Sequence, residues 1–289
     1  MPGRRIILSG HVQGVGFRPF VYRLAKEHGL TGQVRNQLGQ VEVTANGPVT
    51  ALDRFEHDLI AKAPPLSCPR IDDSQDNGAS LFDDFSIVES SAVADAKIFV
   101  PPDYFMCDDC RAELQDADDR RFRYPFINCT QCGPRYTLIE ALPYDRPNTS
   151  MAEFPLCTEC NNEYLEPADR RFHAEPVACP VCGPQLAFVD TARDATLIRD
   201  EALDAALDRL RDGAIVAVKG IGGYHLMCDA GNLAAVAALR QRKFRPDKPL
   251  AVMFPLAGDD GLDVVRQYAD LGDEEAALLS SPGRPIVLT

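Results

Sequence analysis

The sequence predicts an α+β multidomain protein with three parts: a ferredoxin-like domain, two four-cysteine zinc modules and an incomplete α/β domain. Strand-like and helix-like segments follow one another in β-α-β-β-α-β order over residues 1–91. A C-x2-C-x18-C-x2-C pattern occurs twice within residues 100–190. An α/β pattern then runs over residues 198–289.

Apolar spacing predicts the elements of the first domain. The predicted strands cover residues 4–10, 32–36 and 40–45, and the predicted helices cover residues 19–28 and 48–61. Leu52, Phe55 and Leu59 recur at helical spacing, so the second helix should bury one face. Prolines and aspartates over residues 63–80 predict a loop, and residues 85–89 are expected to form the closing strand.

A glycine-rich segment, residues 10–19, joins the first strand to the first helix. Glycines let backbone N–H groups converge, the helix adds its positive N-terminal end, and Arg18 adds a guanidinium fork. Such a segment can bind an anion. On these residues alone, a tight strand-to-helix turn explains it equally well.

Eight of the ten cysteines form two copies of one pattern, 50 residues apart. The copies, at residues 107–132 and 157–182, comprise Cys107, Cys110, Cys129 and Cys132, and Cys157, Cys160, Cys179 and Cys182. Two CxxC turns complete a tetrahedral thiolate shell around Zn²⁺ and leave no position for substrate, so two structural zinc ions are expected. Redox chemistry is disfavoured because no thioredoxin-like context surrounds the pairs.

The pairing of the CxxC turns stays open. We expect each repeat to close its own site, although pairing of the first turn with the fourth is an alternative. Asp119 to Phe122 recurs as Asp169 to Phe172, which indicates duplication of one module. Cys68 and Cys228 stand alone and are expected to be ordinary packed or surface thiols.

The third part alternates helices and strands. Helices are predicted at residues 201–211 and 233–242, and strands at residues 215–219, 250–254 and 286–289. Gly213 is expected to end the first of these helices. The last predicted strand closes the sequence without a cap, so we expect this domain to be truncated. Its clustered cations suit a triphosphate, with ordinary surface charge as the alternative.

Charge and composition limit which partners and which cellular location are expected. The formal net charge is −13, which disfavours nucleic acid as the main partner. The sequence contains no run of about 18 apolar residues, the length that a membrane-spanning helix needs. The first residues lack the pattern of an export signal, so a cytoplasmic location is expected. Residues 90–97 are predicted to be a linker.

The segment from Gly10 to Pro19 resembles the acylphosphatase signature, on the element order which that family uses. The resemblance implies that Arg18 grips the phosphoryl oxygens and that Asn36 orients the attacking water. It also implies a phosphate loop whose amides bind the same oxygens: Gln13, Gly14, Val15, Gly16, Phe17 and Arg18. No histidine or glutamate base is then needed.

The third part resembles the YrdC domain. The resemblance implies contacts to ATP and an acyl-adenylate from six residues: Lys219, Lys243, Arg245, Lys248, Ser281 and Arg284. The order of the three parts resembles the HypF family, the carbamoyltransferases of nickel-iron hydrogenase maturation. That family continues into a transferase domain that this chain lacks.

The HypF resemblance implies a relay. Carbamoyl phosphate is hydrolysed to carbamate, ATP with Mg²⁺ converts carbamate to carbamoyl-adenylate, and the carbamoyl group passes to HypE for cyanide ligand synthesis. The alternative is a zinc-dependent interaction module with a vestigial acylphosphatase domain. A tRNA-modifying YrdC activity is disfavoured by the acidic charge and the missing half-domain.

Overall fold

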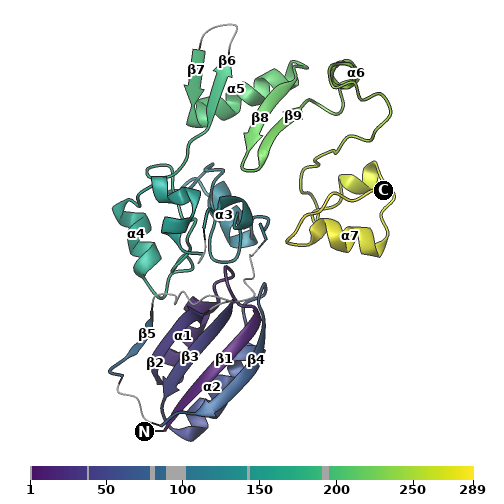
Figure 1. The fold of residues 1–289 in the computed structure, drawn as a ribbon. Helices are drawn as coiled ribbons and strands as arrows, with labels where there is room; N and C mark the ends of the chain where they lie inside the picture. The colour runs from purple at the N-terminus through teal and green to yellow at the C-terminus, as the bar shows by residue number, and fades with distance from the viewer. Residues whose placement is uncertain (1, 38, 79–81, 89–101, 142–143, 191–194) are drawn as a thin grey trace. The chain divides into compact units, whose positions relative to one another are not determined.

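The computed structural model describes residues 2–37, 39–78, 82–88, 102–141, 144–190 and 195–289. It comprises two compact units, Met1–Gly183 and Pro184–Thr289 (Figure 1). The predicted linker at residues 90–97 lies outside the described residues, as does Glu89. Within the described residues, no helix is long and apolar enough to cross a membrane.

The first unit begins with a five-stranded sheet in the order β4-β1-β3-β2-β5. Its elements are β1 (Gly3–His11), α1 (Phe17–Glu27), β2 (Thr31–Gln37), β3 (Gln40–Asn46), α2 (Val49–Ala61), β4 (Cys68–Asp76) and β5 (Phe85–Ile87). β1 pairs antiparallel with β3 and β4, β2 pairs antiparallel with β3, and β5 runs parallel to β2. The predicted ferredoxin-like fold is therefore confirmed.

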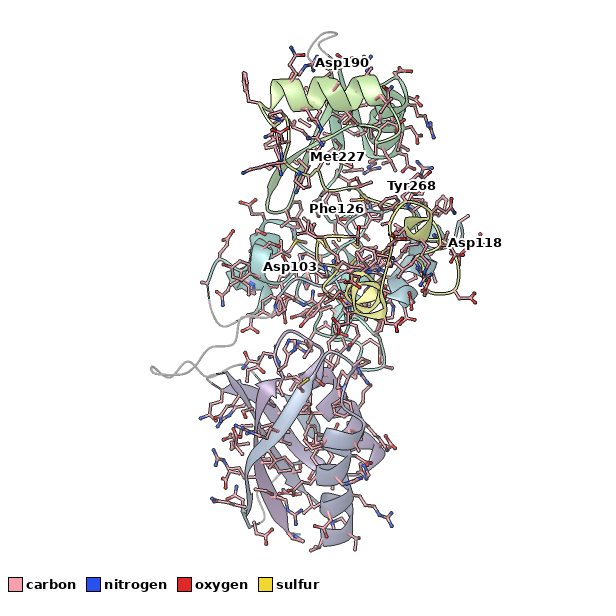
Figure 2. All side chains as sticks on the ribbon, turned by 90° about the vertical axis from the view of Figure 1, so that its right-hand side faces the viewer. Asp103, Asp118, Phe126, Asp190, Met227 and Tyr268 are labelled. Carbon is pink, nitrogen blue, oxygen red and sulfur yellow. The ribbon has the colours of Figure 1, made fainter. Side chains whose placement is uncertain are left out.

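Both helices cover one face of this sheet, as the edge-on view in Figure 2 shows. Leu52, Phe55 and Leu59 are buried on α2, as their spacing predicted. Alternate residues of β2, including Val34 and Asn36, share the buried face. This packing fixes the position of the β1–α1 loop above one end of the sheet.

The predicted loop at residues 63–80 was wrong for its central part. Cys68–Asp76 forms β4, which pairs along β1 and closes the split β-α-β unit. Its polar sequence disguised it, because an edge strand exposes one face and Ile71 packs against the core from the other. The predicted closing strand exists as β5, a short edge strand beside β2.

Two similar metal-binding segments complete the first unit. Each contains one eight-residue helix, α3 (Asp108–Gln115) or α4 (Thr158–Leu165), which begins directly after a cysteine. Short 3-10 turns lie between them: η1 (Tyr136–Leu138), η2 (Arg146–Asn148) and η3 (Ser150–Glu153). Equivalent residues after each helix, Arg123 and His173, adopt the same left-handed backbone with φ of 56° and 53°.

The described part of the second unit, residues 184–190 and 195–289, contains two separate β-hairpins and three α-helices. Its elements are β6 (Ala187–Asp190), β7 (Ala195–Ile198), α5 (Arg199–Arg211), β8 (Val216–Gly220), β9 (Gly223–Met227), α6 (Leu233–Arg242), η4 (Val265–Gln267) and α7 (Asp273–Ser280). Both predicted helices and the strand at residues 215–219 are confirmed as α5, α6 and β8. Gly213 follows α5 with φ of 78°, as expected of a helix stop.

The two other predicted strands of this unit, residues 250–254 and 286–289, are wrong. Both segments are irregular, and Met253 and Ile286 are mostly exposed. A short apolar run becomes a strand only where a neighbouring strand completes its hydrogen bonds. In the described part of the second unit, neither segment has such a neighbour.

Candidate functional site

The eight repeated cysteines form two separate four-sulfur clusters, one within each repeat. In each cluster the four Sγ atoms lie within 4.8 Å of one another. The separations are 3.7 Å for Cys107–Cys129 and 3.5 Å for Cys110–Cys132, and 3.7 Å for Cys157–Cys179. Four sulfurs about 2.3 Å from a tetrahedral Zn²⁺ would be about 3.8 Å apart. The clusters therefore fit zinc, and the expected pairing within each repeat is the one observed.

Backbone groups support the thiolates in the same way in both clusters. The amides of Gln131 and Val181 donate to the Sγ atoms of Cys129 and Cys179 at 3.3 and 3.4 Å. Cys107 and Cys157 cap the N-termini of α3 and α4, where the helix dipole favours negative charge. Bound there, Zn²⁺ would supply a rigid tetrahedral crosslink.

Each cluster also receives an arginine from the other repeat. Arg170 of the second repeat donates to Cys110 Sγ at 3.2 Å, and Arg120 of the first repeat donates to Cys160 Sγ at 3.2 Å. Glu113 and Glu163 bind these arginines at 2.7 and 2.5 Å. Since a Zn(Cys)₄ centre is doubly negative, each arginine offsets part of the charge of the other repeat's centre, and the exchange ties the repeats together.

The neighbouring arginines continue the exchange. Arg121 Nε donates to the carbonyl of Ala178 at 2.9 Å, and Arg171 Nε donates to the carbonyl of Asn128 at 3.1 Å. Arg121 and Arg171 are almost fully buried. The two repeats therefore form one body, in which removal of either half would leave buried cations without partners.

The β1–α1 turn and the start of α1 contain the residues of the predicted phosphate loop, Gln13 to Arg18. Gly14 and Gly16 adopt φ of 69° and 72°, which other residues rarely reach. A Cβ atom at Gly16 would lie 2.8 Å from the Cβ atom of Thr130, so the loop fits closely against the first metal-binding repeat. Among the described residues, none accepts a hydrogen bond from the amides of residues 13–18.

The first repeat sets the orientation of this loop. Arg135 Nε donates to the carbonyl of Gly14 at 2.8 Å, and Gln131 Nε2 donates to the carbonyl of Val15 at 3.3 Å. Because C=O and N–H point in opposite directions across a trans peptide, the following amides turn the other way. The loop thus presents donors suited to an anion.

Arg135 links this loop to the metal cluster. Its remaining nitrogens donate to the carbonyls of Cys129, Cys132 and Pro134 at 2.8 to 3.0 Å, and its side chain is fully buried. Its backbone amide donates to Asp103, labelled in Figure 2, at 2.6 Å. A buried cation with four carbonyl acceptors is a rigid connection between the metal and the loop.

A partly enclosed pocket lies between the predicted phosphate loop and the metal-binding repeats. Its lining comprises Val12, Gln13, Gly14, Gly16, Phe17, Arg18, Pro19, Thr130, Arg135, Tyr144, His173, Ala174, Glu175 and Pro176. The predicted loop residues therefore meet at one site, except Val15, which is buried in the sheet core.

Arg18 lies in this pocket with a side chain only 12% exposed. Its nearest carboxylates, Asp145 and Glu175, stand 3.6 and 3.9 Å away, which is beyond hydrogen-bond distance. In the described part of the chain, its guanidinium has no hydrogen-bond acceptor. A guanidinium that lines a pocket and is not hydrogen-bonded to the protein is suited to an anionic ligand.

Glu175 is the most buried acidic group of the pocket wall, with 3% of its surface exposed. Its Oε2 atom accepts from the Arg146 amide at 2.8 Å and from the Tyr164 hydroxyl at 3.0 Å. Burial raises the pKa of this carboxyl, while the positive charge of Arg18 opposes the shift.

Two more titratable groups line the pocket. Burial, reinforced by the charge of Arg18, lowers the pKa of His173 to about 4, so the imidazole is neutral near pH 7. Burial raises the pKa of Tyr144 to about 12, and its hydroxyl has no hydrogen-bond partner among the described residues. His173 and Tyr144 thus offer polar groups that are neutral near pH 7 beside Arg18.

Asn36 lies near the pocket but is not among its lining residues. It pairs across the sheet with Val41, which pairs with Leu8 near the end of β1. Its side chain is buried, and its Oδ1 atom has no hydrogen-bond partner in the described residues. A buried amide oxygen with no partner is suited to hold a water molecule.

The six candidate nucleotide-binding residues occupy three segments of the second unit. Lys219 lies on β8 opposite Tyr224, and the segment from Lys243 to Lys248 follows α6. Arg245 donates to the carbonyl of Pro249 at 2.9 Å. After α7, Ser281 and Arg284 donate to the carbonyls of Leu278 and Leu279 at 2.7 and 2.6 Å. Their role in nucleotide binding stays a prediction.

Sequence reasoning missed the pocket residues that the repeats contribute, chiefly Arg135, Tyr144, His173 and Glu175. At the 50-residue spacing, Arg135 corresponds to Gln185 and Glu175 corresponds to Pro125. Most positions outside the shared cysteines and short motifs also differ between the repeats, so the sequence did not single these residues out.

Three family models match consecutive parts of the chain. The acylphosphatase model matches residues 4–87, and the HypF finger model matches residues 106–139 and 156–189. The Sua5–YciO–YrdC model, described as telomere recombination, matches residues 208–289.

Curated relatives match almost the whole chain. Carbamoyltransferase HypF2 of Cupriavidus necator is 53% identical over 98% of the chain and 35% of its own length. Probable carbamoyltransferase HypF of Methanocaldococcus jannaschii is 47% identical over 98% of the chain and 36% of its own length. The chain thus spans about a third of these relatives.

Solved structures agree. Full-length HypF in a phosphate- and nucleotide-bound form superposes with a TM-score of 0.87 at 40% identity, over 97% of this chain and 36% of that protein. HypF of T. kodakarensis superposes with a TM-score of 0.84 at 45% identity, over 98% of this chain and 35% of that protein. The family resemblance predicted from the motifs is confirmed.

Proposed function

Because the chain belongs to the HypF carbamoyltransferase family, we propose that its first unit hydrolyses carbamoyl phosphate to carbamate and phosphate. The phosphoryl group occupies the phosphate loop, where the amides of residues 13–18 and the Arg18 guanidinium surround its oxygens. The carbamoyl end then faces the wall formed by the metal-binding repeats.

In this proposal Asn36 holds the attacking water through its Oδ1 atom. A bond forms from the water oxygen to phosphorus, and the bond from phosphorus to the carbamoyl oxygen breaks. Carbamate leaves with the bonding electrons, and the water proton passes to phosphate or solvent. Because carbamate is a good leaving group, charge stabilisation and positioning carry most of the catalysis.

The later steps also form part of the proposal. The second unit contributes Lys219, Lys243, Arg245 and Lys248, with Ser281 and Arg284, to a site where ATP with Mg²⁺ converts carbamate to carbamoyl-adenylate and pyrophosphate. HypE accepts the carbamoyl group, in the cytoplasm, for the cyanide ligand of nickel-iron hydrogenase. The two Zn²⁺ ions are structural and hold the pocket wall in place.

One observation carries the hydrolytic proposal: the Arg18 guanidinium and the amides of residues 13–18 lie at one pocket, and among the described residues they have no hydrogen-bond acceptor. A vestigial domain serving only as an interaction module would have no use for this convergence of amide donors and positive charge. This contrast favours the enzyme over the zinc-dependent interaction module.

Phosphate release from carbamoyl phosphate tests the proposal, with Arg18→Ala and Asn36→Ala beside the wild type. Loss of the arginine should lower kcat by about 10²- to 10³-fold, the usual effect of removing a group that stabilises transition-state charge. Arg111→Ala, an exposed arginine on α3, provides the control. Equal rates for wild type and Arg18→Ala would rule out this active site.

A further inference from the structure

The wall opposite the phosphate loop must contact whatever is attached to the phosphoryl group. The loop amides and Arg18 take up the phosphoryl oxygens, so the acyl part of the substrate points toward the metal-binding repeats. Tyr144, His173 and Glu175 line that side of the pocket. Among them, Glu175 is the carboxylate, and it comes from the second repeat.

The two oxygens of Glu175 have different environments. Oε2 is fixed by two donors, the Arg146 amide at 2.8 Å and the Tyr164 hydroxyl at 3.0 Å. Oε1 lies 3.9 Å from the Arg18 guanidinium and accepts no hydrogen bond in the described part of the chain. The carboxylate is therefore held rigidly with one acceptor still available beside the site of phosphoryl binding.

A carboxylate oxygen without a hydrogen-bond donor is otherwise unfavourable here. It repels an incoming phosphate, and it belongs to a residue with only 3% of its surface exposed. A hydrogen-bond donor on the substrate would offset both effects. The carbamoyl group carries such a donor, its N–H₂, whereas the equally sized acetyl group presents a methyl that would leave Oε1 unpaired.

Resting on the proposed hydrolysis, we propose that Glu175 is a specificity-determining residue whose Oε1 atom accepts a hydrogen bond from the carbamoyl N–H₂. It selects carbamoyl phosphate over acyl phosphates that lack an N–H donor at this position. Selection thus comes from the second metal-binding repeat, while phosphoryl binding comes from the phosphate loop. No step of bond making or breaking passes through Glu175.

Glu175→Gln tests this role sharply. The Arg146 amide and the Tyr164 hydroxyl both need an acceptor, so the glutamine oxygen takes the Oε2 position and the amide N–H₂ faces the pocket. The acceptor that faces the substrate N–H₂ is thereby replaced by a donor, and the side chain keeps its shape. The ratio of kcat/KM for carbamoyl phosphate to that for acetyl phosphate should fall about 10- to 100-fold, as expected for a hydrogen bond to a charged group.

Asp145→Asn is the matched control, because Asp145 also faces Arg18, at 3.6 Å. If Glu175 acted only by positioning Arg18, both variants would change kcat/KM for carbamoyl phosphate and for acetyl phosphate by equal factors. We expect equal factors for Asp145→Asn and unequal factors for Glu175→Gln. If Glu175→Gln leaves the ratio of kcat/KM for the two substrates unchanged, whatever its absolute rates, the proposal is overturned. A protonated Glu175 that acts as a donor would also give an unchanged ratio, because glutamine is a donor too.

The two proposals fail in different ways. A wild-type, zinc-loaded chain that releases no phosphate from carbamoyl phosphate contradicts the hydrolytic function, whereas an active wild type with an unchanged ratio in Glu175→Gln contradicts only the specificity role. If Glu175→Gln does not fold with two zinc ions, Tyr164→Phe replaces it. Removing one donor to Oε2 should lower the ratio about threefold, and an unchanged ratio would again overturn the role.

Discussion

The two metal-binding repeats share one framework and differ in what they present to the phosphate loop. In both, a helix begins after the first cysteine, a backbone amide supports the third, and an arginine reaches the cluster of the other repeat. Arg135 of the first repeat holds the loop carbonyls, and Glu175 of the second faces Arg18. Neither residue has a counterpart in the other repeat.

This difference separates two roles. The shared residues build a metal-stabilised body, and the unshared residues complete the pocket. Substitutions in the first group should therefore act through zinc and stability, whereas those in the second group should also act on turnover of the substrate or on the groups that line the pocket.

The largest effect is expected from loss of a shared ligand. Cys110→Ser and Cys160→Ser should each retain one zinc ion per chain rather than two, and should lower the free energy of unfolding by several kcal/mol, because metal binding is coupled to folding. Metal analysis and urea unfolding measure this. Cys68→Ser, at an exposed thiol outside both clusters, should keep two ions. Two ions in Cys110→Ser would contradict the assigned clusters.

A somewhat smaller effect is expected at the unshared Arg135. Its loss leaves four buried carbonyls without a donor, so Arg135→Ala should be less stable by about 3–5 kcal/mol and should lose most of its phosphate release. Gln185→Ala, at the corresponding position of the second repeat, should change neither by much. Similar losses of stability and of phosphate release in both variants would show that the two repeats support the loop equally.

Loss of an exchanged arginine should weaken zinc binding by an intermediate amount, and at the cluster of the other repeat rather than of its own. Arg170→Ala should weaken zinc binding about 10- to 100-fold at the cluster of the first repeat, and Arg120→Ala should do so at the cluster of the second. Alkylation during chelator challenge, followed by peptide mass spectrometry, identifies which cysteines lose their metal. If each variant instead exposes the cysteines of its own repeat, the exchange is not functionally important.

The smallest effect is expected from His173, whose counterpart Arg123 does not titrate in the same range. A histidine with a folded pKa of about 4 and an ordinary value near 6.5 stabilises the fold fully above pH 6.5 and less as pH falls toward 4. Between pH 7 and 5, the wild type should lose up to about 2 kcal/mol more stability than His173→Asn. Asparagine tolerates the left-handed backbone at this position.

Urea unfolding at both pH values, at equal zinc content, measures this difference. Glu175 shifts in the opposite direction and gains stability as pH falls, but it is present in both proteins and cancels in the comparison. A difference that does not depend on pH would assign His173 a purely steric role.

The sequence predicted what local patterns encode. Helical spacing located α1, α2, α5 and α6, and cysteine spacing located both clusters. It missed β4 because an edge strand can be almost wholly polar, and it placed strands at residues 250–254 and 286–289 because an apolar run does not reveal whether a partner strand exists.

Only the part of the pocket that the β1–α1 loop forms was predicted from the sequence. The phosphate loop is contiguous in sequence and resembles a known signature, so Gln13, Gly14, Gly16 and Arg18 could be expected to meet. Glu175 lies 157 residues after Arg18, and its place in the pocket depends on tertiary packing, which no local pattern encodes.

Calorimetric titration of the zinc-loaded chain with inorganic phosphate tests most directly whether the loop and Arg18 form an anion site. One phosphate should bind per wild-type chain, and Arg18→Ala should weaken that binding at least about tenfold, as loss of a charge-assisted hydrogen bond requires. Phosphate binding of equal strength in the wild type and in Arg18→Ala would contradict the site.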